Sequence, residues 1–451
     1  MSDPILALPR FPVVGEQPFQ GDLLNRKQLA EHLTTYLYRL QAGAVLAIDA
    51  SWGEGKTWFG RNWAAHLKNE SHKVIYIDVF EQDYIEDSFM LLSAEILEAI
   101  GENDLAPKLI ETAANITKAL LPLGTKILVN AIGHWALGAS NLSDKANDIL
   151  ESAVDDAAET SSGWIKDRLT KHAGDKVLMQ KFKEQLSEFA NSDPERPIVI
   201  FIDELDRCKP TFAVELIERI KHFFDVPNIV FVLLLNRNQL EKAVKGVYGA
   251  ETDAALYLSK FVNFFFKLPK EQVGETLRFE RTKRFVQNVA KNYKFDPGSQ
   301  IESFVHGIAL LTPVLDLSLR DIERCIALYA FAYPHNLSDR LLAYVTALKI
   351  SHSALFTRIL AKDPTAHQIA KEHIDSKRDR LINSQTFHNP MSDDHRYLQA
   401  LSEWHKGHIE GFDKEIEQFR YYAGHLRGFD IDMEQVFEAL SKEIDLPMEF
   451  R

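Results

Sequence analysis

A short segment, LAIDASWGEGKT at residues 46–57, holds the residues best suited to chemistry. The segment begins within an apolar run at residues 44–48, continues as a loop of small residues, and leads into a helical pattern that begins at Trp58. This strand–loop–helix context is the one that a phosphate-binding loop needs. Gly53 and Gly55 allow successive backbone N–H groups to point inward as an anion nest, and the helix N-terminus adds partial positive charge.

The side chains of this loop predict contacts with a nucleotide. Lys56 would reach the β- and γ-phosphate oxygens, and Thr57 would hold Mg²⁺ by its hydroxyl. The motif G-x-x-x-x-G-K-[ST] expects a glycine where Ala50 stands, and alanine tolerates a positive φ poorly. The alternative is a small-residue turn followed by a lysine. The predicted cofactor-binding residues are Ser51, Trp52, Gly53, Glu54, Gly55, Lys56, Thr57 and Trp58.

A second apolar run, residues 198–202, ends in two carboxylates, Asp203 and Glu204. Such a run suits a strand that is buried on both faces of a parallel sheet. Its carboxyl end is the edge at which α/β proteins bind ligands. There Asp203 can hold Mg²⁺ opposite Thr57, and Glu204 can polarise an attacking water. The alternative is a solvated turn that contains two acidic residues.

Two further residues follow these strands. Arg207 could sense the nucleotide of a neighbouring subunit, or Asp206 and Arg207 could form a structural ion pair. Asn236 follows the apolar run NIVFVLLL at residues 228–235. Its amide could orient the lytic water or read the γ-phosphate. The alternative is a plain turn at a strand end, a position that asparagine favours.

The order and spacing of these segments resemble those of the KAP family of P-loop NTPases. The resemblance covers roughly residues 17 to 345, and it implies an αβα sandwich with an additional strand between the two Walker strands. With the helical patterns described below, we expect an α/β P-loop NTPase with a helical insertion and a helical C-terminal lid and tail. The matching segments are GDLLNRKQLAEHL, WGEGKT, VIYIDVFEQDYIEDSF, FIDELDRCKP, VFVLLLNRNQLEKAVKGVYG, YLSKFVNFFFKLP and LSLRDIER.

The resemblance also implies roles for single residues. Members of the family bind ATP, and many are bacterial proteins of phage exclusion or defence. By this resemblance Lys56 and Thr57 take the phosphate and Mg²⁺ roles, and Asp203 takes the Walker B role. The family often has aspartate at the positions of Glu204 and Asn236. A glutamate at the first position favours active hydrolysis, and an amide at the second is closer to the AAA+ arrangement.

We therefore expect an Mg²⁺-dependent ATPase that couples its nucleotide state to the assembly or action of a multi-protein complex. Antiphage defence is the setting that the resemblance implies, with a Qat-like system as one example. Two alternatives stay open, a nucleotide-gated scaffold with incidental hydrolysis and a membrane-peripheral ATPase. The expected partners are ATP and other protein subunits, and the chain could also form a homo-oligomer.

The motifs and helical patterns divide the chain into five predicted segments. A minimal NTPase core would not need the long stretch between the second strand and the strand that ends at Asp203. The segments are 1–101 (first half of the core), 102–192 (helical insertion), 193–270 (second half of the core), 271–345 (helical lid) and 346–451 (C-terminal helical region).

Composition limits the class of protein. The 451 residues are 45% hydrophobic and 26% charged, which is ordinary for a globular protein. A net charge of −13 argues against a protein that coats nucleic acid, although it allows a local basic groove. Only two cysteines occur, Cys208 and Cys325, so a reducing compartment fits better than a disulfide framework. The first residues do not read as a signal peptide, and we expect a cytoplasmic protein.

The insertion contains one apolar stretch, residues 120–142, that is long enough to span a bilayer. Lys126, Asn130 and His134 form one polar stripe on it, and a central lysine costs about 2.5–3.5 kcal/mol on insertion. We therefore expect an amphipathic helix that packs on the core or on a partner. The next segment, residues 146–157, carries a narrow apolar seam that suits a bundle or an oligomer contact.

Two features of the helical C-terminal part carry expectations. Ser318 should cap a helix that places Arg320 in the lid, where this side chain could reach the γ-phosphate or could form a surface ion pair. A metal site is not expected, because no cysteine or carboxylate pattern completes a set. We expect solvated side chains for the four histidines in question, His388, His395, His405 and His408.

Overall fold

The computed structural model describes most of the NTPase core and most of the helical C-terminal part. The described residues are 14–40, 43–81, 88–100, 108–109, 111–113, 116, 164–193, 195–223, 225–269, 275–295, 301–332, 338–383, 393–411 and 436–445.

A five-stranded parallel sheet forms the centre of the N-terminal part, in the order β2-β3-β4-β1-β5. β4 lies between the strand before the phosphate loop and the strand that ends in Asp203, so the predicted additional strand is confirmed. Because all strands run the same way, their carboxyl ends meet at one edge. The strands are β1 (Ala44–Asp49), β2 (Val74–Asp78), β3 (Ile198–Asp203), β4 (Ile229–Leu235) and β5 (Phe264–Lys267).

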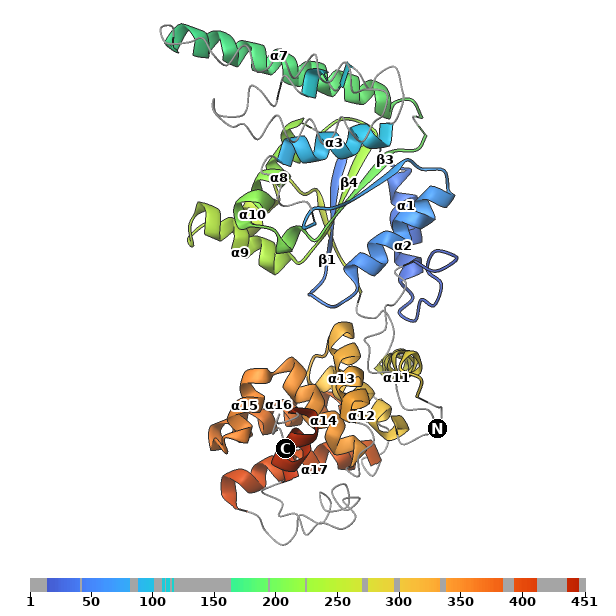
Figure 1. The fold of residues 1–451 in the computed structure, drawn as a ribbon, viewed down its shortest axis with the longest axis vertical. Helices are drawn as coiled ribbons and strands as arrows, with labels where there is room; N and C mark the ends of the chain where they lie inside the picture. The colour runs from blue at the N-terminus through green and yellow to red at the C-terminus, as the bar shows by residue number, and fades with distance from the viewer. Residues whose placement is uncertain are drawn as a thin grey trace, which may run out of the picture.

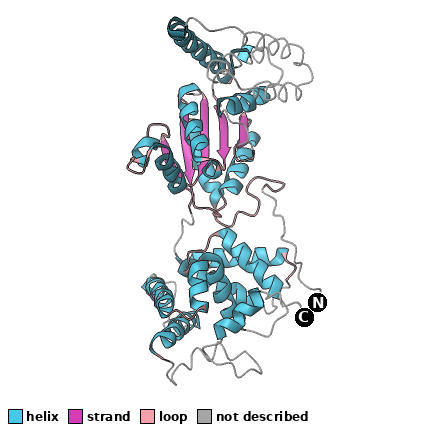
Figure 2. Cartoon of the chain, turned by 60° about the vertical axis from the view of Figure 1, so that its left-hand side comes forward, coloured by secondary structure: helices cyan, strands magenta, loops and turns pink. Residues whose placement is uncertain are grey.

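Helices cover both faces of the sheet, as Figures 1 and 2 show. One buried cluster joins the sheet to α1 (Arg26–Leu37) and α2 (Lys56–Asn69). The central strands β3 and β4 are buried along their whole length, which explains their continuous apolar runs. The other face packs against α3 (Ser88–Ile100), the end of α7 (Trp164–Ala190), α8 (Pro210–Phe223), α9 (Arg237–Tyr248) and α10 (Ala254–Leu258).

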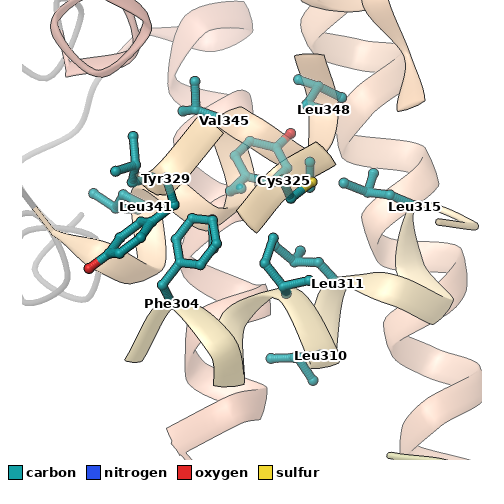
Figure 3. Close-up of a cluster of buried hydrophobic side chains, with 14 of the residues drawn as sticks. Phe304, Leu310, Leu311, Leu315, Cys325, Tyr329, Leu341, Val345 and Leu348 are labelled. Atoms are coloured by element: carbon teal, nitrogen blue, oxygen red, sulfur yellow. The ribbon is translucent and has the colours of Figure 1, made fainter. Parts of the chain in front are cut away.

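The C-terminal part is helical and has its own core, drawn in Figure 3. This cluster extends from Val286 to Ile444, so residues on both sides of the predicted 345/346 boundary share it. Its helices are α11 (Glu275–Asn292), α12 (Ile301–Val314), α13 (Leu319–Ala332), α14 (Asp339–Ser351), α15 (Ser353–Leu360), α16 (Pro364–Asn383), α17 (Asp393–Glu410) and α19 (Val436–Asp445). We call α11 to α14 the lid.

Two sequence expectations concern the insertion. Residues 120–142 and the apolar seam at 146–157 lie outside the described residues, so both interpretations stay predictions. Among the helices that are described, none has the length and apolar character needed to cross a bilayer.

Candidate nucleotide-binding site

The phosphate loop connects β1 to α2 and has the conformation that its glycines predict. Gly53 and Gly55 have φ values of 80° and 76°, in the left-handed region that favours glycine. Ala50 is not among the described residues with positive φ, and its N–H donates to the Leu235 carbonyl at 3.2 Å. The missing glycine therefore falls at a position that does not require one.

Lys56, the first residue of α2, folds back into the loop. Its Nζ donates to the carbonyl oxygens of Ala50 at 2.9 Å and Ser51 at 3.3 Å. Burial lowers the pKa of this lysine, and the carboxylates of the 203–206 segment oppose that effect. A phosphate that entered the loop would offer the ammonium a charged acceptor in place of two carbonyls.

Asp203 is buried at the carboxyl end of β3, and protein donors hold both of its oxygens. The Tyr76 hydroxyl donates to Oδ2 at 2.8 Å, and the Glu204 N–H donates to Oδ1 at 2.8 Å. Burial raises the pKa of the carboxyl group, and hydrogen bonds from Tyr76 and Thr57 lower it. A carboxylate beside a threonine hydroxyl is a donor set that suits Mg²⁺, a hard cation that binds oxygen and keeps several waters.

Glu204 has an unusual backbone and two side-chain partners. Its φ is 63°, a strained conformation for a residue other than glycine, and strain of this kind clusters at functional sites. Its Oε1 accepts a hydrogen bond from the Thr57 hydroxyl at 3.3 Å, and its Oε2 pairs with Arg207 on the next turn, η2 (Leu205–Arg207). Burial raises the pKa of Glu204, and the charge of Arg207 lowers it.

The ion-pair partner of Arg207 is therefore not Asp206, the partner considered from the sequence. Arg207 pairs with Glu204, while Asp206 accepts a hydrogen bond from the indole of Trp52. The Trp52 contact joins the phosphate loop to the segment after β3, across 154 positions of sequence. Trp58 lines a cavity between the sheet edge and the lid, and its ring packs edge-on against Phe19.

Asn236 directly follows β4, the strand that lies between β1 and β3. Its side chain caps α9 by accepting a hydrogen bond from the Gln239 N–H at 3.4 Å, and the residue is buried. It is not among the described residues that line the cavity. The structure thus gives Asn236 a capping role, and its predicted contact with water or γ-phosphate stays a prediction.

The lid reaches the loop through the start of α13. Ser318 and Asp321 cap this helix reciprocally, which confirms the predicted cap. The Arg320 N–H donates to the Gly53 carbonyl at 3.2 Å. A Cβ on Gly53 would lie 2.6 Å from Ser318 Oγ and 2.8 Å from Arg320 Cβ, so glycine also permits this close approach. The Arg320 side chain lies near Glu323. Burial raises the pKa of Glu323, and the charge of Arg320 lowers it.

Between the sheet edge and the lid lies a cavity of about 550 Å³. The loop, the 203–207 segment and the α13 side chains of Arg320 and Glu323 line it. No site role was predicted from the sequence for three further parts of its wall, the turn at residues 21–24, Arg26, and one face of α11. That face presents Phe285, Asn288, Val289 and Asn292.

Arg26 is the least expected of these residues. It is 2% exposed, and its Nη1 donates to the Gly55 carbonyl at 3.3 Å. Burial lowers its pKa to about 10, against the charges of Glu54 and Asp22. The guanidinium is therefore charged at neutral pH, and its hydrogen bond to Gly55 stabilises the loop. Glu54, a predicted cofactor-binding residue, is buried beside it.

Of the four histidines expected to be solvated, His388 lies outside the described residues, and His395 and His408 are half-buried. His405 is fully buried, so the prediction of a solvated side chain was wrong for it. It accepts or donates hydrogen bonds with the Tyr344 hydroxyl at 2.6 Å and His367 Nδ1 at 2.9 Å. Helices α14, α16 and α17 bring these residues together, and spacing along one helix could not reveal that. Within the described residues, no group of three or more histidine, cysteine or acidic side chains is placed to hold a metal.

The sheet order, the left-handed glycines and the lysine at the start of α2 define the fold as that of a P-loop NTPase. A family model described as "KAP family P-loop domain" matches residues 26–336. The chain therefore belongs to the KAP family of P-loop NTPases.

Two similar proteins give this family membership a context. The phage T7 exclusion protein of Escherichia coli (strain K12) is 25% identical over 326 residues, which make up 65% of this chain and 39% of that protein. The chain thus spans about two fifths of that relative's length. The solved structure of the Aeropyrum pernix ORC2 protein covers 98% of both chains at 11% identity. Its TM-score of 0.36 is too low to inform fold or function.

Proposed function

We propose that this protein binds ATP with Mg²⁺, hydrolyses it, and uses its nucleotide state to control a multi-protein assembly of antiphage defence. One observation carries the proposal. Lys56 and Thr57 at the start of α2, and Asp203 and Glu204 at the end of β3, line one cavity whose volume suits a small ligand. The defence role rests on family membership and on the similarity to a phage exclusion protein.

The cavity supports one orientation of the nucleotide. The phosphates would lie on the N–H groups of the 52–57 loop at the N-terminus of α2. The base and sugar would extend between the 21–24 turn and the α11 face, where Leu24, Phe285 and Val289 supply apolar surface. Asn288 and Asn292 lie one turn apart on that face and offer amide groups to the edge of a base.

The side chains divide the chemistry among them. Lys56 would exchange its two loop carbonyls for phosphate oxygens. Thr57 and Asp203 would hold Mg²⁺, and the bound ion would neutralise charge on the phosphates. Glu204 would accept the proton of the attacking water after its bond to Thr57 is given up. Arg207 would keep Glu204 ionised and oriented until then.

Coupling to other subunits would pass through the lid. The Gly53 carbonyl bonds the first turn of α13, and α13 shares its core with the remaining C-terminal helices. A loop that reorganises around phosphate therefore moves or holds the start of α13. Arg320, which lines the cavity beside Glu323, would turn to the γ-phosphate when ATP is present.

The test of hydrolysis is Glu204→Gln, which keeps the size of the side chain and removes the basic carboxylate. We expect ATP binding within about threefold of wild type and turnover reduced about 100-fold or more. The matched control is Glu215→Gln, on the surface of α8, which should turn over ATP like wild type. Equal turnover in wild type and Glu204→Gln would contradict the proposed mechanism.

A nucleotide-gated scaffold is the second candidate, and the contact between Gly53 and α13 favours it as well, because binding alone could set the lid. The two functions differ in a phage-plating assay with the neighbouring genes present. Hydrolysis-driven defence predicts that Glu204→Gln and Lys56→Ala both lose protection. A scaffold predicts that Glu204→Gln keeps protection and that Lys56→Ala loses it.

A further inference from the structure

Tyr76 on β2 contacts the site, although no role there was predicted for it from the sequence. Its hydroxyl donates to Asp203 Oδ2 at 2.8 Å, across 127 positions of sequence. In a contact between a phenol hydroxyl and a carboxylate, the hydroxyl donates and the carboxylate accepts, so this bond can fix the orientation of Asp203. The described part of the cavity wall does not include Tyr76, so a nucleotide would not touch it.

The sheet register explains why this contact forms. Tyr76 pairs with Phe201, and Asp78 pairs with Asp203. Side chains two residues apart point to the same face, so Tyr76, Phe201 and Asp203 all face α2. The Tyr76 ring stacks on Phe201 at 5.7 Å and 18° between planes. Its hydroxyl thereby extends about two residues along the strand, which is about 6–7 Å, and meets the carboxylate.

Helix α2 packs against the Tyr76 ring. The Arg61 guanidinium lies 5.4 Å from the ring centroid and also bonds the hydroxyl. Gly60 lets α2 lie close to the sheet here, since a Cβ there would overlap Leu234 Cδ1 and would lie 3.3 Å from Tyr76 Oη. The same helix carries Lys56 and Thr57 at its N-terminus. Tyr76 therefore joins the helix of the phosphate loop to the carboxylate at the end of β3.

We propose that Tyr76 is a positioning residue for Mg²⁺: it holds Asp203 in the orientation in which this carboxylate and Thr57 bind the ion or its waters. The inference rests on the proposed function, because it assumes an Mg²⁺–nucleotide complex in the cavity. Without the Tyr76 hydroxyl, Asp203 Oδ2 would lose its hydrogen bond at 2.8 Å, while Oδ1 would keep the bond from the Glu204 N–H. Losing a partner of this kind lowers metal affinity by about 10–100-fold in other metal sites.

The experiment compares nucleotide affinity with and without Mg²⁺, using a fluorescent ATP analogue and Tyr76→Phe. We expect wild-type affinity in the absence of Mg²⁺. The Mg²⁺ concentration that gives half of the Mg²⁺-dependent gain in nucleotide affinity should rise about 10-fold in Tyr76→Phe. The matched control is Tyr38→Phe, which removes another hydroxyl bonded to a carboxylate, that of Glu70, at an exposed position. This control should follow wild type throughout.

A second variant protects the test against a folding defect. Arg61→Met removes the guanidinium over the ring and keeps the tyrosine, and it should shift the Mg²⁺ dependence in the same direction by a smaller factor. The inference is overturned if the folded variants keep the wild-type Mg²⁺ dependence. A wild-type protein whose nucleotide affinity ignores Mg²⁺ would overturn both the inference and the proposed Mg²⁺ site. Failure of the inference alone would leave the wild-type dependence intact.

Discussion

The sheet edge and the lid form opposite walls of one cavity, but they are built differently. The sheet belongs to two buried clusters, one on each face, and neither includes a described lid residue. The lid belongs to a third cluster, which extends through the C-terminal helices to Ile444 and includes no described residue of the sheet. The two parts are therefore packed separately and meet at the cavity, where the bond between Arg320 and Gly53 lies.

The sheet edge and the C-terminal helices also differ in their buried polar groups. At the sheet edge, Lys56 and Asp203 are buried and point to one cavity, where burial shifts both pKa values against the charged forms. In the lid and its neighbours, Tyr344, His367 and His405 bond one another away from the cavity. The sheet edge thus buries charged groups beside a cavity, whereas the C-terminal helices bury polar groups that bond one another and fix the packing of the helices.

The largest expected effect concerns ATP binding at the sheet edge. Lys56→Ala should reduce ATP affinity about 100-fold or more, because it removes charge-assisted bonds to phosphate. Equilibrium binding of a fluorescent ATP analogue measures the change. Lys68→Ala, at the exposed other end of α2, is the control and should bind like wild type. Unchanged binding by Lys56→Ala would show that the loop does not hold phosphate.

Acidification should change the stability of the sheet edge and of the C-terminal helices in opposite directions. Burial lowers the pKa of His405 well below its usual value and that of His367 to about 4, so the unfolded chain binds more protons below pH 6.5 and the helices lose stability as pH falls. A buried histidine that stays neutral costs about 2 kcal/mol between pH 7 and pH 5. Asp203 and Glu204 have raised pKa values, so the same change of pH favours the folded sheet edge.

Hydrogen exchange read by peptide at pH 7 and pH 5, after correction for intrinsic rates, measures the two responses separately. Protection should fall in α16 and α17 and hold in β3. His367→Leu should weaken the pH dependence of the helices, and His222→Leu, on the exposed side of α8, should not change it. Equal loss of protection in both parts would contradict the contrast drawn here.

A smaller effect concerns the point at which the two walls touch. Gly53→Ala adds a Cβ at a φ of 80° and within 2.8 Å of Arg320 Cβ, so ATP affinity should fall about tenfold. Ala50→Gly, in the same loop, should stay within about twofold, because Ala50 is not in the left-handed region. Binding measurements on the pair test whether the loop needs glycine for its backbone and lid contact or for sequence pattern alone.

The smallest effect distinguishes two roles of Arg207. An arginine that completes a neighbouring site contributes about 10³–10⁵ in turnover, whereas one that holds its own Glu204 should contribute less than about tenfold. The ion pair with Glu204 favours the second role. We expect Arg207→Ala to lose less than tenfold in turnover at every protein concentration, with Arg196→Ala as the control. A thousandfold loss that depends on concentration would instead indicate a site shared between subunits.

Much of the core could be predicted from local pattern. The apolar runs gave strands at β1, β3 and β4 within one residue of their observed ends, and the cap of α13 was readable from Ser318 and Asp321. The family resemblance supplied the position of β4, because strand order is not encoded in any single run. Ala50 does not take a positive φ, since the loop takes these values at Gly53 and Gly55, and the effect of Ala50 on ATP affinity stays a prediction.

The chain itself determined the loop, the carboxylates at the end of β3 and the helical nature of the C-terminal part. These depend on spacing and on backbone preferences that act over a few residues. The tertiary structure decided which distant groups meet them, namely Tyr76 at Asp203, Arg26 under Gly55, Trp52 at Asp206 and the α11 face across the cavity. It also buried His405 among three helices. Such contacts follow from strand register and helix packing over tens to hundreds of residues, so no local pattern records them.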